Sequence, residues 1–205
     1  MPVQRRLPCE AVSSNPEFRA LASIRGIAVD LRYAGCDNFV GRNLYGDLNC
    51  AWLQREAAAG LERAASMLGQ GYPALTLLVL DALRPHRVQQ QLWQHLEGTE
   101  LRSYLADPAR GSIHSFGMAV DVTLMDDTGT ALDMGTGFDD LSELSHPDLE
   151  DAHLAQGRLS PEQFANRMVL RSAMCGSGFR AIHSEWWHFD FGDRDLIRQH
   201  YLRID

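Results

Sequence analysis

Hydrophobic and polar positions along the chain follow two different periods. Alternation with a period of two, or an unbroken apolar run, predicts strands at 27–33, 75–80, 119–124 and 186–191. Alanine, leucine and charged residues at helical spacing predict helices at 56–70, 88–96, 161–174 and 195–202. Helices and strands do not alternate strictly, as they would in a doubly wound sheet. The pattern therefore predicts an α+β fold with a central, mostly antiparallel sheet that is flanked by helices.

One of these helices carries a clear start signal. In Ser160-Pro161-Glu162-Gln163, serine stands at the N-cap, proline at the first helical position and glutamine two positions later. This is the capping-box pattern, in which the N-cap and N3 side chains satisfy each other's backbone N–H groups. We expect the helix to run from this signal through Met174 and to end at Gly176.

Length and composition limit the architecture and the partners. The chain has 205 residues, of which 45% are hydrophobic and 22% charged. This is enough for one good core and too little for two large domains, so we expect one compact domain over 1–205. The net charge is −8, and the 19 Lys and Arg residues are spread along the chain, which argues against a nucleic acid as partner. No apolar stretch reaches the roughly 20 residues of a membrane span.

The N-terminus and the cysteines bear on cellular location. No hydrophobic core of a secretory signal follows Arg5-Arg6, so we expect a cytoplasmic protein. A protein trimmed of its export signal would read the same, which keeps the periplasm as the alternative. Four cysteines lack paired C-x-x-C spacing and are expected to be free thiols. The sequence predicts no particular oligomeric state.

Two segments far apart in the chain carry the side chains of a metal site. His114 and Asp121 lie in the first segment, and Glu185 and His188 lie in the second. Two imidazoles and one carboxylate suit a catalytic zinc, which keeps three protein ligands and leaves a fourth position for water. We therefore expect one Zn²⁺ per chain, bound in a cleft by His114, Asp121 and His188. The fourth side chain, Glu185, is then free to handle protons, as in a metallohydrolase.

Residue spacing shows how these ligands can converge. In the half-buried strand expected at 119–124, Asp121 lies on the face opposite the apolar positions. His114 precedes Asp121 by an odd number of residues and would point away from it on a regular strand, so Gly117 is expected to supply a bend. His188 shares a strand face with Asp190. Glu185 has the wrong parity for that face, so we expect it on the turn that enters the strand.

Each of these residues also has an ordinary structural interpretation. A single histidine is more often a hydrogen-bonded core or surface residue than a metal ligand. Asp121 can be a carboxylate at a strand end, Glu185 a solvated turn residue and Arg84 a partner of a helix end. Only the joint pattern favours a metal site. Five further histidines lack such a setting and are expected to be surface residues or hydrogen-bonded side chains: His95, His146, His153, His183 and His200. His86 is ambiguous.

The two motifs, Ser-x-His with an aspartate seven residues after the histidine, and Glu-x-x-His, resemble those of a known family. The chain is similar to the D-alanyl-D-alanine dipeptidases of the vancomycin-resistance type, within the wider group of zinc D,D-peptidases. Further segments resemble that family in the same order, so that the likeness covers nearly the whole chain: 30–41, 83–85, 134–146 and 166–179.

The resemblance implies a role for each site residue. Zinc ligands fall on His114, Asp121 and His188, the catalytic base on Glu185, and an arginine that stabilises the transition state on Arg84. Three further residues fall where the family lines its dipeptide pocket: Ser112, Tyr33 and Asp139. Asp139 is suited to hold the free ammonium of a substrate. Loss of an oxyanion donor costs on the order of 10²- to 10³-fold in turnover, so Arg84→Ala is expected to damage catalysis more than folding.

The expected function is hydrolysis of a small D-amino-acid dipeptide, D-alanyl-D-alanine, to free D-alanine by a zinc-activated water with Glu185 as general base. A zinc D,D-carboxypeptidase or a peptidoglycan endopeptidase is the alternative among enzymes. A noncatalytic zinc-binding recognition module is the alternative outside them, and the presence of Glu185 and Arg84 argues against it. Antibiotic resistance, recycling of wall fragments and use of D-alanine as a nutrient all require the same chemistry.

Overall fold

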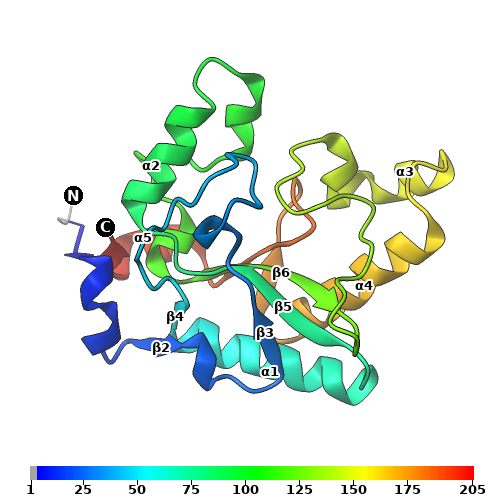
Figure 1. The fold of residues 1–205 in the computed structure, drawn as a ribbon, viewed down its shortest axis with the longest axis horizontal. Helices are drawn as coiled ribbons and strands as arrows, with labels where there is room; N and C mark the ends of the chain where they lie inside the picture. Colours follow the sequence, from blue (N-terminus) through cyan, green and yellow to red (C-terminus); the bar gives the residue numbers. More distant parts are fainter. Residues whose placement is uncertain (1–3) are drawn as a thin grey trace.

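A computed structural model describes residues 4–205, and a five-stranded sheet lies at its centre (Figure 1). The strands follow the order β3 (Ile27–Val29), β5 (Thr76–Asp81), β6 (Ala119–Met125), β8 (His188–Phe191) and β7 (Phe179–Ala181). β3 pairs with β5 in parallel, and the other neighbours in this sheet pair antiparallel. The prediction of a mostly antiparallel sheet is confirmed.

The remaining elements frame this sheet. Two small sheets join β2 (Phe18–Ala20) to β4 (Trp52–Gln54) and β1 (Arg6–Leu7) to β9 (Arg203–Ile204). The α-helices are α1 (Arg55–Gly71), α2 (His86–His95), α3 (Glu150–Ala155), α4 (Pro161–Gly176) and α5 (Arg194–His200). Short 3₁₀ helices are η1 (Cys9–Ser14), η2 (Leu21–Ser23), η3 (Arg32–Ala34), η4 (Glu100–Tyr104), η5 (Ile113–Phe116), η6 (Glu143–Ser145) and η7 (Pro147–Leu149).

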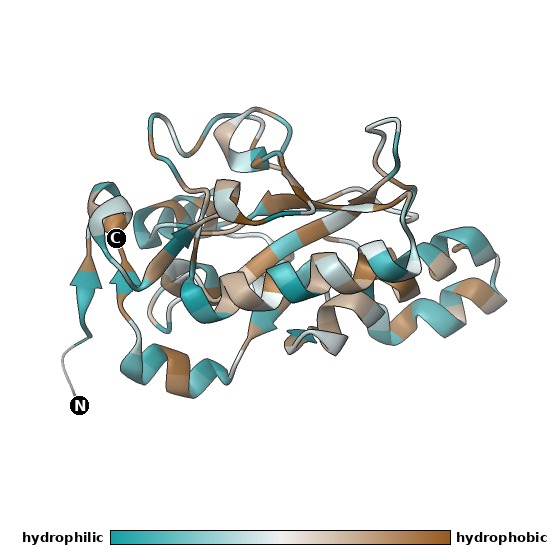
Figure 2. Ribbon diagram, turned by 90° about the horizontal axis from the view of Figure 1, so that it is seen from below, coloured by the Kyte–Doolittle hydropathy of each residue, from teal (hydrophilic) through white to brown (hydrophobic). Residues whose placement is uncertain are grey.

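Helices α1 and α4 pack against one face of the sheet. Hydrophobic and hydrophilic residues alternate along α1 (Figure 2), and its apolar positions, such as Leu61, join the sheet residues Val79 and Val122 in one core. Gly60 allows the close approach, because a Cβ there would lie 2.5 Å from the ring of Phe191. A second cluster, which joins buried residues of the N-terminal segments to α2, shares the partly buried Leu31 and Phe138 with the first. The chain thus forms a single α+β domain.

Helix α4 begins as the sequence predicts and also anchors a loop. The Ser160 Oγ accepts from the Gln163 N–H at 3.1 Å, and the Gln163 side chain accepts from the Ser160 N–H at 2.8 Å, which completes the capping box. Arg167 is 1% exposed and donates to the carbonyls of Met134, at 2.7 Å, and Leu144, at 3.0 Å. These bonds fix both ends of the segment 134–144, which contributes Asp139 to the cavity described below.

Three strand predictions are corrected by the structure. The strand expected at 27–33 ends at Val29, and Arg32–Ala34 forms η3. β6 is not half-buried: Asp121 is 2% and Thr123 is 5% exposed, although neither faces α1. β6 lies between β5 and β8 in the sheet (Figure 1), and its residues from Ala119 to Leu124 are buried on both faces of the strand. The strand expected at 186–191 begins at His188, because Trp186 and Trp187 form a turn.

The cysteines and the helices agree with what the sequence led us to expect. All four cysteines are free, as predicted, with Cys9 and Cys50 buried and Cys36 and Cys175 exposed. Within residues 4–205, none of the helices combines the length and the apolar character that a membrane crossing needs.

Candidate active site and metal centre

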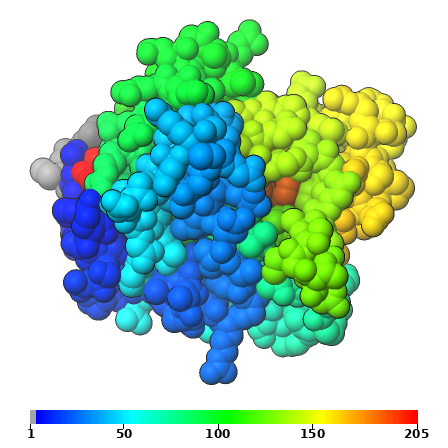
Figure 3. All heavy atoms as spheres, viewed as in Figure 1, coloured from blue at the N-terminus to red at the C-terminus, as the bar shows by residue number. Residues whose placement is uncertain are grey.

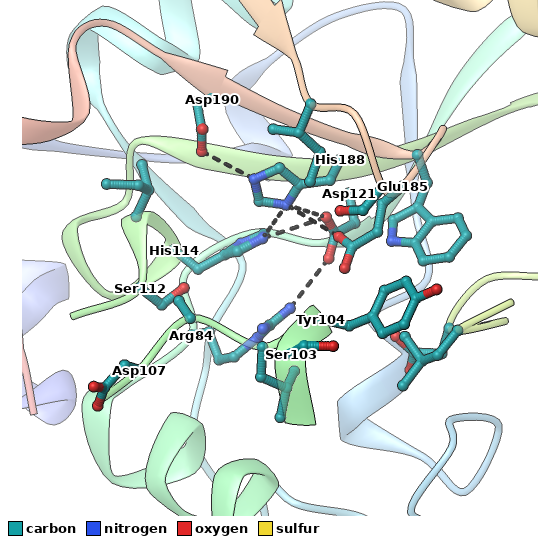
Figure 4. Close-up of a pocket in the computed structure, with 18 of the residues that line it drawn as sticks. Arg84, Ser103, Tyr104, Asp107, Ser112, His114, Asp121, Glu185, His188 and Asp190 are labelled. Carbon is teal, nitrogen blue, oxygen red and sulfur yellow. Dashed lines mark hydrogen bonds and ion pairs between the residues drawn. The ribbon is translucent and has the colours of Figure 1, made fainter. Parts of the chain in front are cut away.

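Three buried side chains from three elements point at one another (Figure 4). One donor atom each of His114, Asp121 and His188 lies within 4.8 Å of the other two. Asp121 Oδ1 is 2.9 Å from His188 Nδ1 and 3.3 Å from His114 Nε2, and the two ring nitrogens are 3.1 Å apart. Donor atoms around a tetrahedral zinc lie about 3.3 to 3.6 Å apart, as its bond lengths require. The three residues therefore fit a divalent metal ion.

Strand pairing and one glycine bring the donors together. Asp121 on β6 is directly opposite His188 on β8 in the antiparallel register. His114 lies on η5, before the strand, and Gly117 turns the chain between them with φ 67°. A Cβ at this position would lie 3.0 Å from the backbone N of Gln54, so the close approach also requires glycine. The bend expected at Gly117 is confirmed.

Hydrogen bonds at the far side of each ring fix which nitrogen faces the centre. His114 Nδ1 lies 2.7 Å from the Ala82 carbonyl, which can only accept, so Nε2 is left to bind a metal. His188 Nε2 lies 2.9 Å from Asp190 Oδ1, which leaves Nδ1 as its ligand atom. Arg194 Nε in turn donates to Asp190 Oδ2 at 2.5 Å. Such partners orient histidine ligands and raise their basicity.

Electrostatics at this centre favour positive charge. Burial opposes ionisation of Asp121, but the charges and hydrogen bonds of His114 and His188 outweigh it and hold the pKa of Asp121 well below its usual range. Burial disfavours the His188 imidazolium, but Asp190 and Asp121 raise its pKa to about 10. A field that stabilises a proton on a ring nitrogen also stabilises a divalent cation at the same place.

Glu185 lies beside this centre, on the turn before β8, as its parity predicted. Its Oε2 is 4.0 Å from His188 Nδ1, and its side chain is 13% exposed. Burial raises the pKa of Glu185 to about 7, with the Asp121 charge adding to the effect and the His188 charge opposing it. A carboxyl group with a pKa near neutrality can both accept and return a proton at physiological pH.

Arg84 connects the centre to a buried hydrogen-bond network. Its Nη2 lies 3.1 Å from Asp121 Oδ2, its Nε donates to Asp81 Oδ2 at 2.8 Å, and its Nη1 donates to Gln89 Oε1 at 3.2 Å. The Tyr45 hydroxyl donates to the other Asp81 oxygen. Arg84 is thus held rigidly at the wall of the cavity by partners on β5 and α2.

The three residues expected to line a substrate pocket lie in the same cavity, of about 660 Å³. Asp139 Oδ1 accepts from the Tyr33 hydroxyl at 3.0 Å, and within residues 4–205 its buried Oδ2 has no partner. Burial raises the pKa of Asp139 to about 8, with Arg84 opposing the shift and Asp121 adding to it. Its φ of 62° is strained for a residue other than glycine. Ser112 is 4% exposed and precedes η5.

The structure thus brings all eight predicted site residues into one cavity. In the space-filling view, orange atoms from the C-terminal part of the chain are visible in a hollow between blue and yellow-green segments (Figure 3). Sequence reasoning missed the roles of Asp81, Gln89 and Asp190. Asp190 shares a strand face with His188, and Asp81 follows an apolar strand directly, so both carried a signal that was not used. Gln89 carried none.

Comparisons with known proteins agree with this geometry. The D-ala-D-ala dipeptidase family, peptidase M15, matches the chain over residues 16–204. The D-alanyl-D-alanine dipeptidase of Escherichia coli (strain K12) is 37% identical over 164 residues, which are 80% of this chain and 78% of the relative. That of Enterococcus faecium is 34% identical, over 87% of this chain and 92% of the relative. The chain belongs to the D-ala-D-ala dipeptidase family.

This dipeptidase family is metal-dependent, and the resemblance deduced from the motifs is confirmed. Within residues 4–205, His114, Asp121 and His188 are the one group of side chains whose ligand atoms lie close enough together to hold a metal ion. Another relative with the same name, from Enterococcus faecalis (strain ATCC 700802 / V583), is 31% identical over 83% of this chain and 88% of its own length. Among solved structures, the LdcB LD-carboxypeptidase aligns with a TM-score of 0.48 at 14% identity, over 90% of this chain and 72% of that chain.

The Asp190 contact leads to a prediction about metal binding in this dipeptidase-family chain. We expect Asp190→Asn to lower the affinity for Zn²⁺ about 10- to 100-fold, because the His188 ring loses its charged partner. The measurement is competition with a chromophoric chelator at fixed pH, which needs no turnover. Asp127→Asn, on the exposed turn after β6, removes the same charge and serves as the control. Equal affinities in the wild type and Asp190→Asn would contradict the role of Asp190.

Proposed function

We propose that the protein is a zinc-dependent dipeptidase that hydrolyses D-alanyl-D-alanine to two molecules of D-alanine. The proposal is supported by the relatives, which are named for this activity. The single observation that carries it is the convergence of His114, Asp121 and His188 next to Glu185, in a cavity that also holds a buried, half-unpaired carboxylate at Asp139. A metal site alone would suit many hydrolases, and the second feature selects a small substrate with a free amine.

The reaction follows from the positions of Glu185 and Arg84. Zinc, when bound, is a Lewis acid that lowers the pKa of water from about 15.7 toward about 7. Glu185 accepts the proton of the attacking water and later returns it to the leaving nitrogen, a double role that its pKa of about 7 permits. Negative charge that develops on the peptide oxygen is stabilised by the Arg84 guanidinium, which its three buried partners keep in place before the substrate arrives.

Asp139 provides the selection for a dipeptide. Its unpaired Oδ2 can accept from a substrate ammonium, and that positive charge favours the ionised carboxylate, which burial otherwise disfavours. An N-acylated or longer substrate has no ammonium at this position. Oδ2 of Asp139 would then lack this charge-assisted contact, which is worth about 1.5 to 3 kcal/mol. The free dipeptide is therefore preferred over a peptide within a wall polymer.

The experiment that tests this function compares two substrates. We expect the zinc-loaded protein to release D-alanine from D-alanyl-D-alanine, and to act at least about tenfold more slowly on the N-acetylated dipeptide, as the unpaired Asp139 requires. The release should stop after chelation and return with Zn²⁺. Asp139→Asn should raise KM for the free dipeptide and reduce the difference in rate between the free and the N-acetylated dipeptide. D-alanine release is measured by a coupled amino-acid assay.

Other outcomes of this experiment have distinct meanings. Equal rates on both substrates would contradict a dipeptidase and indicate a D,D-carboxypeptidase. Cleavage confined to cross-linked wall peptides would indicate an endopeptidase. Tight zinc binding without turnover of any substrate would indicate a noncatalytic recognition module.

A further inference from the structure

Three arginine side chains line a part of the cavity that the proposed reaction does not use: Arg110, Arg194 and Arg198. Arg194 and Arg198 are four residues apart on α5, so they lie on the same side of that helix. Arg110 comes from the loop two residues before Ser112. Two separate segments of the chain therefore place cations at one end of the cavity.

Acidic neighbours compensate these cations only in part. Arg194 Nε donates a hydrogen bond to Asp190, and Arg198 Nε donates one to the Gly111 carbonyl at 3.1 Å. The carboxylate nearest to Arg198 is that of Asp195, at 3.4 Å, and its side chain is 77% exposed. Within residues 4–205, the Arg110 guanidinium makes no ion pair. Like charges four residues apart on a helix destabilise it, and the chain as a whole carries −8. The two carboxylates in contact with these arginines, Asp190 and Asp195, thus leave one of the three positive charges without a partner.

The pKa of one arginine reflects the same crowding. Burial lowers the pKa of Arg198, and the charges of Arg110 and Arg194 lower it further, while Asp195 and Asp190 oppose the shift. The Arg198 guanidinium is therefore close enough to those of Arg110 and Arg194 to be repelled by both. Arg198 is also held in place at Gly111, next to the pocket residue Ser112, and its side chain is only 18% exposed.

A series of contacts connects Asp139 to the arginines through the metal ligands. Asp139 bonds to Tyr33, whose ring lies 4.9 Å from the Arg84 guanidinium. Arg84 contacts Asp121, and Asp121 contacts His188. On the far side of the His188 ring, the contacts continue through Asp190 to Arg194 (Figure 4 shows the contacts from Arg84 to Asp190). Along this series of contacts, the metal ligands Asp121 and His188 thus lie between the carboxyl group of Asp139 and the guanidinium of Arg194.

We propose that Arg110, Arg194 and Arg198 form a subsite for carboxylates of the leaving amino acid, and that the subsite extends the substrate range to dipeptides with an acidic C-terminal residue. This inference rests on the proposed function, because an ammonium at Asp139 directs the other end of a dipeptide toward the arginines. One guanidinium suffices to bind one carboxylate bidentately. Three guanidiniums can therefore hold the α-carboxylate and a side-chain carboxylate together, as in D-alanyl-D-glutamate.

The test compares D-alanyl-D-glutamate with D-alanyl-D-glutamine, which have nearly the same shape and differ by one charge. We expect the zinc-loaded wild type to show a kcat/KM about tenfold higher for the glutamate dipeptide, the size of one charge-assisted contact. Arg110→Gln should abolish this preference, mainly through a higher KM for the glutamate dipeptide. Arg158→Gln removes the same charge at an exposed position outside the cavity and should retain the preference.

A binding measurement separates this subsite from the proposed function. If no dipeptide is cleaved, the proposed function fails, and calorimetry then decides on the subsite alone. D-Glutamate should bind the zinc-loaded wild type more tightly than D-glutamine does, and Arg110→Gln should remove the difference. Equal binding of the two amino acids, equal kcat/KM for the two dipeptides in the wild type, or an equal loss for both in Arg110→Gln would overturn the proposal.

Discussion

Replacing Glu185 by glutamine is expected to lower kcat for D-alanyl-D-alanine by about 10²- to 10⁴-fold, the contribution of a positioned general base. Glutamine keeps the shape of the side chain and loses the ability to accept a proton. Oε2 of Glu185 is 4.0 Å from His188 Nδ1 and is not one of the three converging donors, so zinc affinity should stay close to that of the wild type. Steady-state rates and zinc content are measured on the same preparations.

Glu143→Gln is the matched control for this substitution. Glu143 is exposed on η6 and does not line the cavity, so its loss of charge should leave kcat within about twofold, as for most surface substitutions. A Glu185→Gln protein that binds zinc normally and turns over at the wild-type rate would remove the base from the mechanism. A lower zinc content in Glu185→Gln would instead place Glu185 among the ligands.

Replacing Arg84 by lysine is expected to lower kcat by about 10²- to 10³-fold, the cost of losing one preorganised donor to a developing oxyanion. Lysine keeps the positive charge but cannot donate simultaneously to Asp81, Gln89 and Asp121 in the fixed geometry of a guanidinium. The lysine ammonium is therefore a positive charge without a fixed position. The measurement is kcat for D-alanyl-D-alanine, together with urea unfolding of the same protein.

The alanine variant tests folding as much as catalysis at this position. The sequence suggested that Arg84→Ala damages catalysis more than folding. In the structure, alanine would leave Asp81, which is fully buried, without its cationic partner. Breaking a buried pair in this way costs about 3 to 5 kcal/mol of unfolding free energy. Arg87→Lys, in an exposed pair with Glu10, is the control and should change neither quantity appreciably. A stable, fully active Arg84→Lys protein would contradict the assigned role.

Local patterns in the sequence determined where helices and strands form and on which strand face each metal ligand lies. The capping box at Ser160 specified the start of α4, because its hydrogen bonds form between residues three apart. The parity of Asp121 and His188 placed both on the cleft side of their strands, since side chains alternate strictly along a strand. The odd spacing of His114 required a bend, and Gly117 was the residue able to make it. All of these inferences depend on residues that are near one another in the chain.

The tertiary structure alone decided which contacts hold the site residues in place. Tyr33 and Asp139 are 106 residues apart, and their hydrogen bond depends on a loop that Arg167 holds from α4. The partners of Arg84 and the cationic end of the cavity likewise combine segments that no local period relates. Sequence periodicity indicates on which face of its helix or strand a residue lies. The residue that it meets there is set by strand register and by the packing of loops, which are long-range properties of the folded chain.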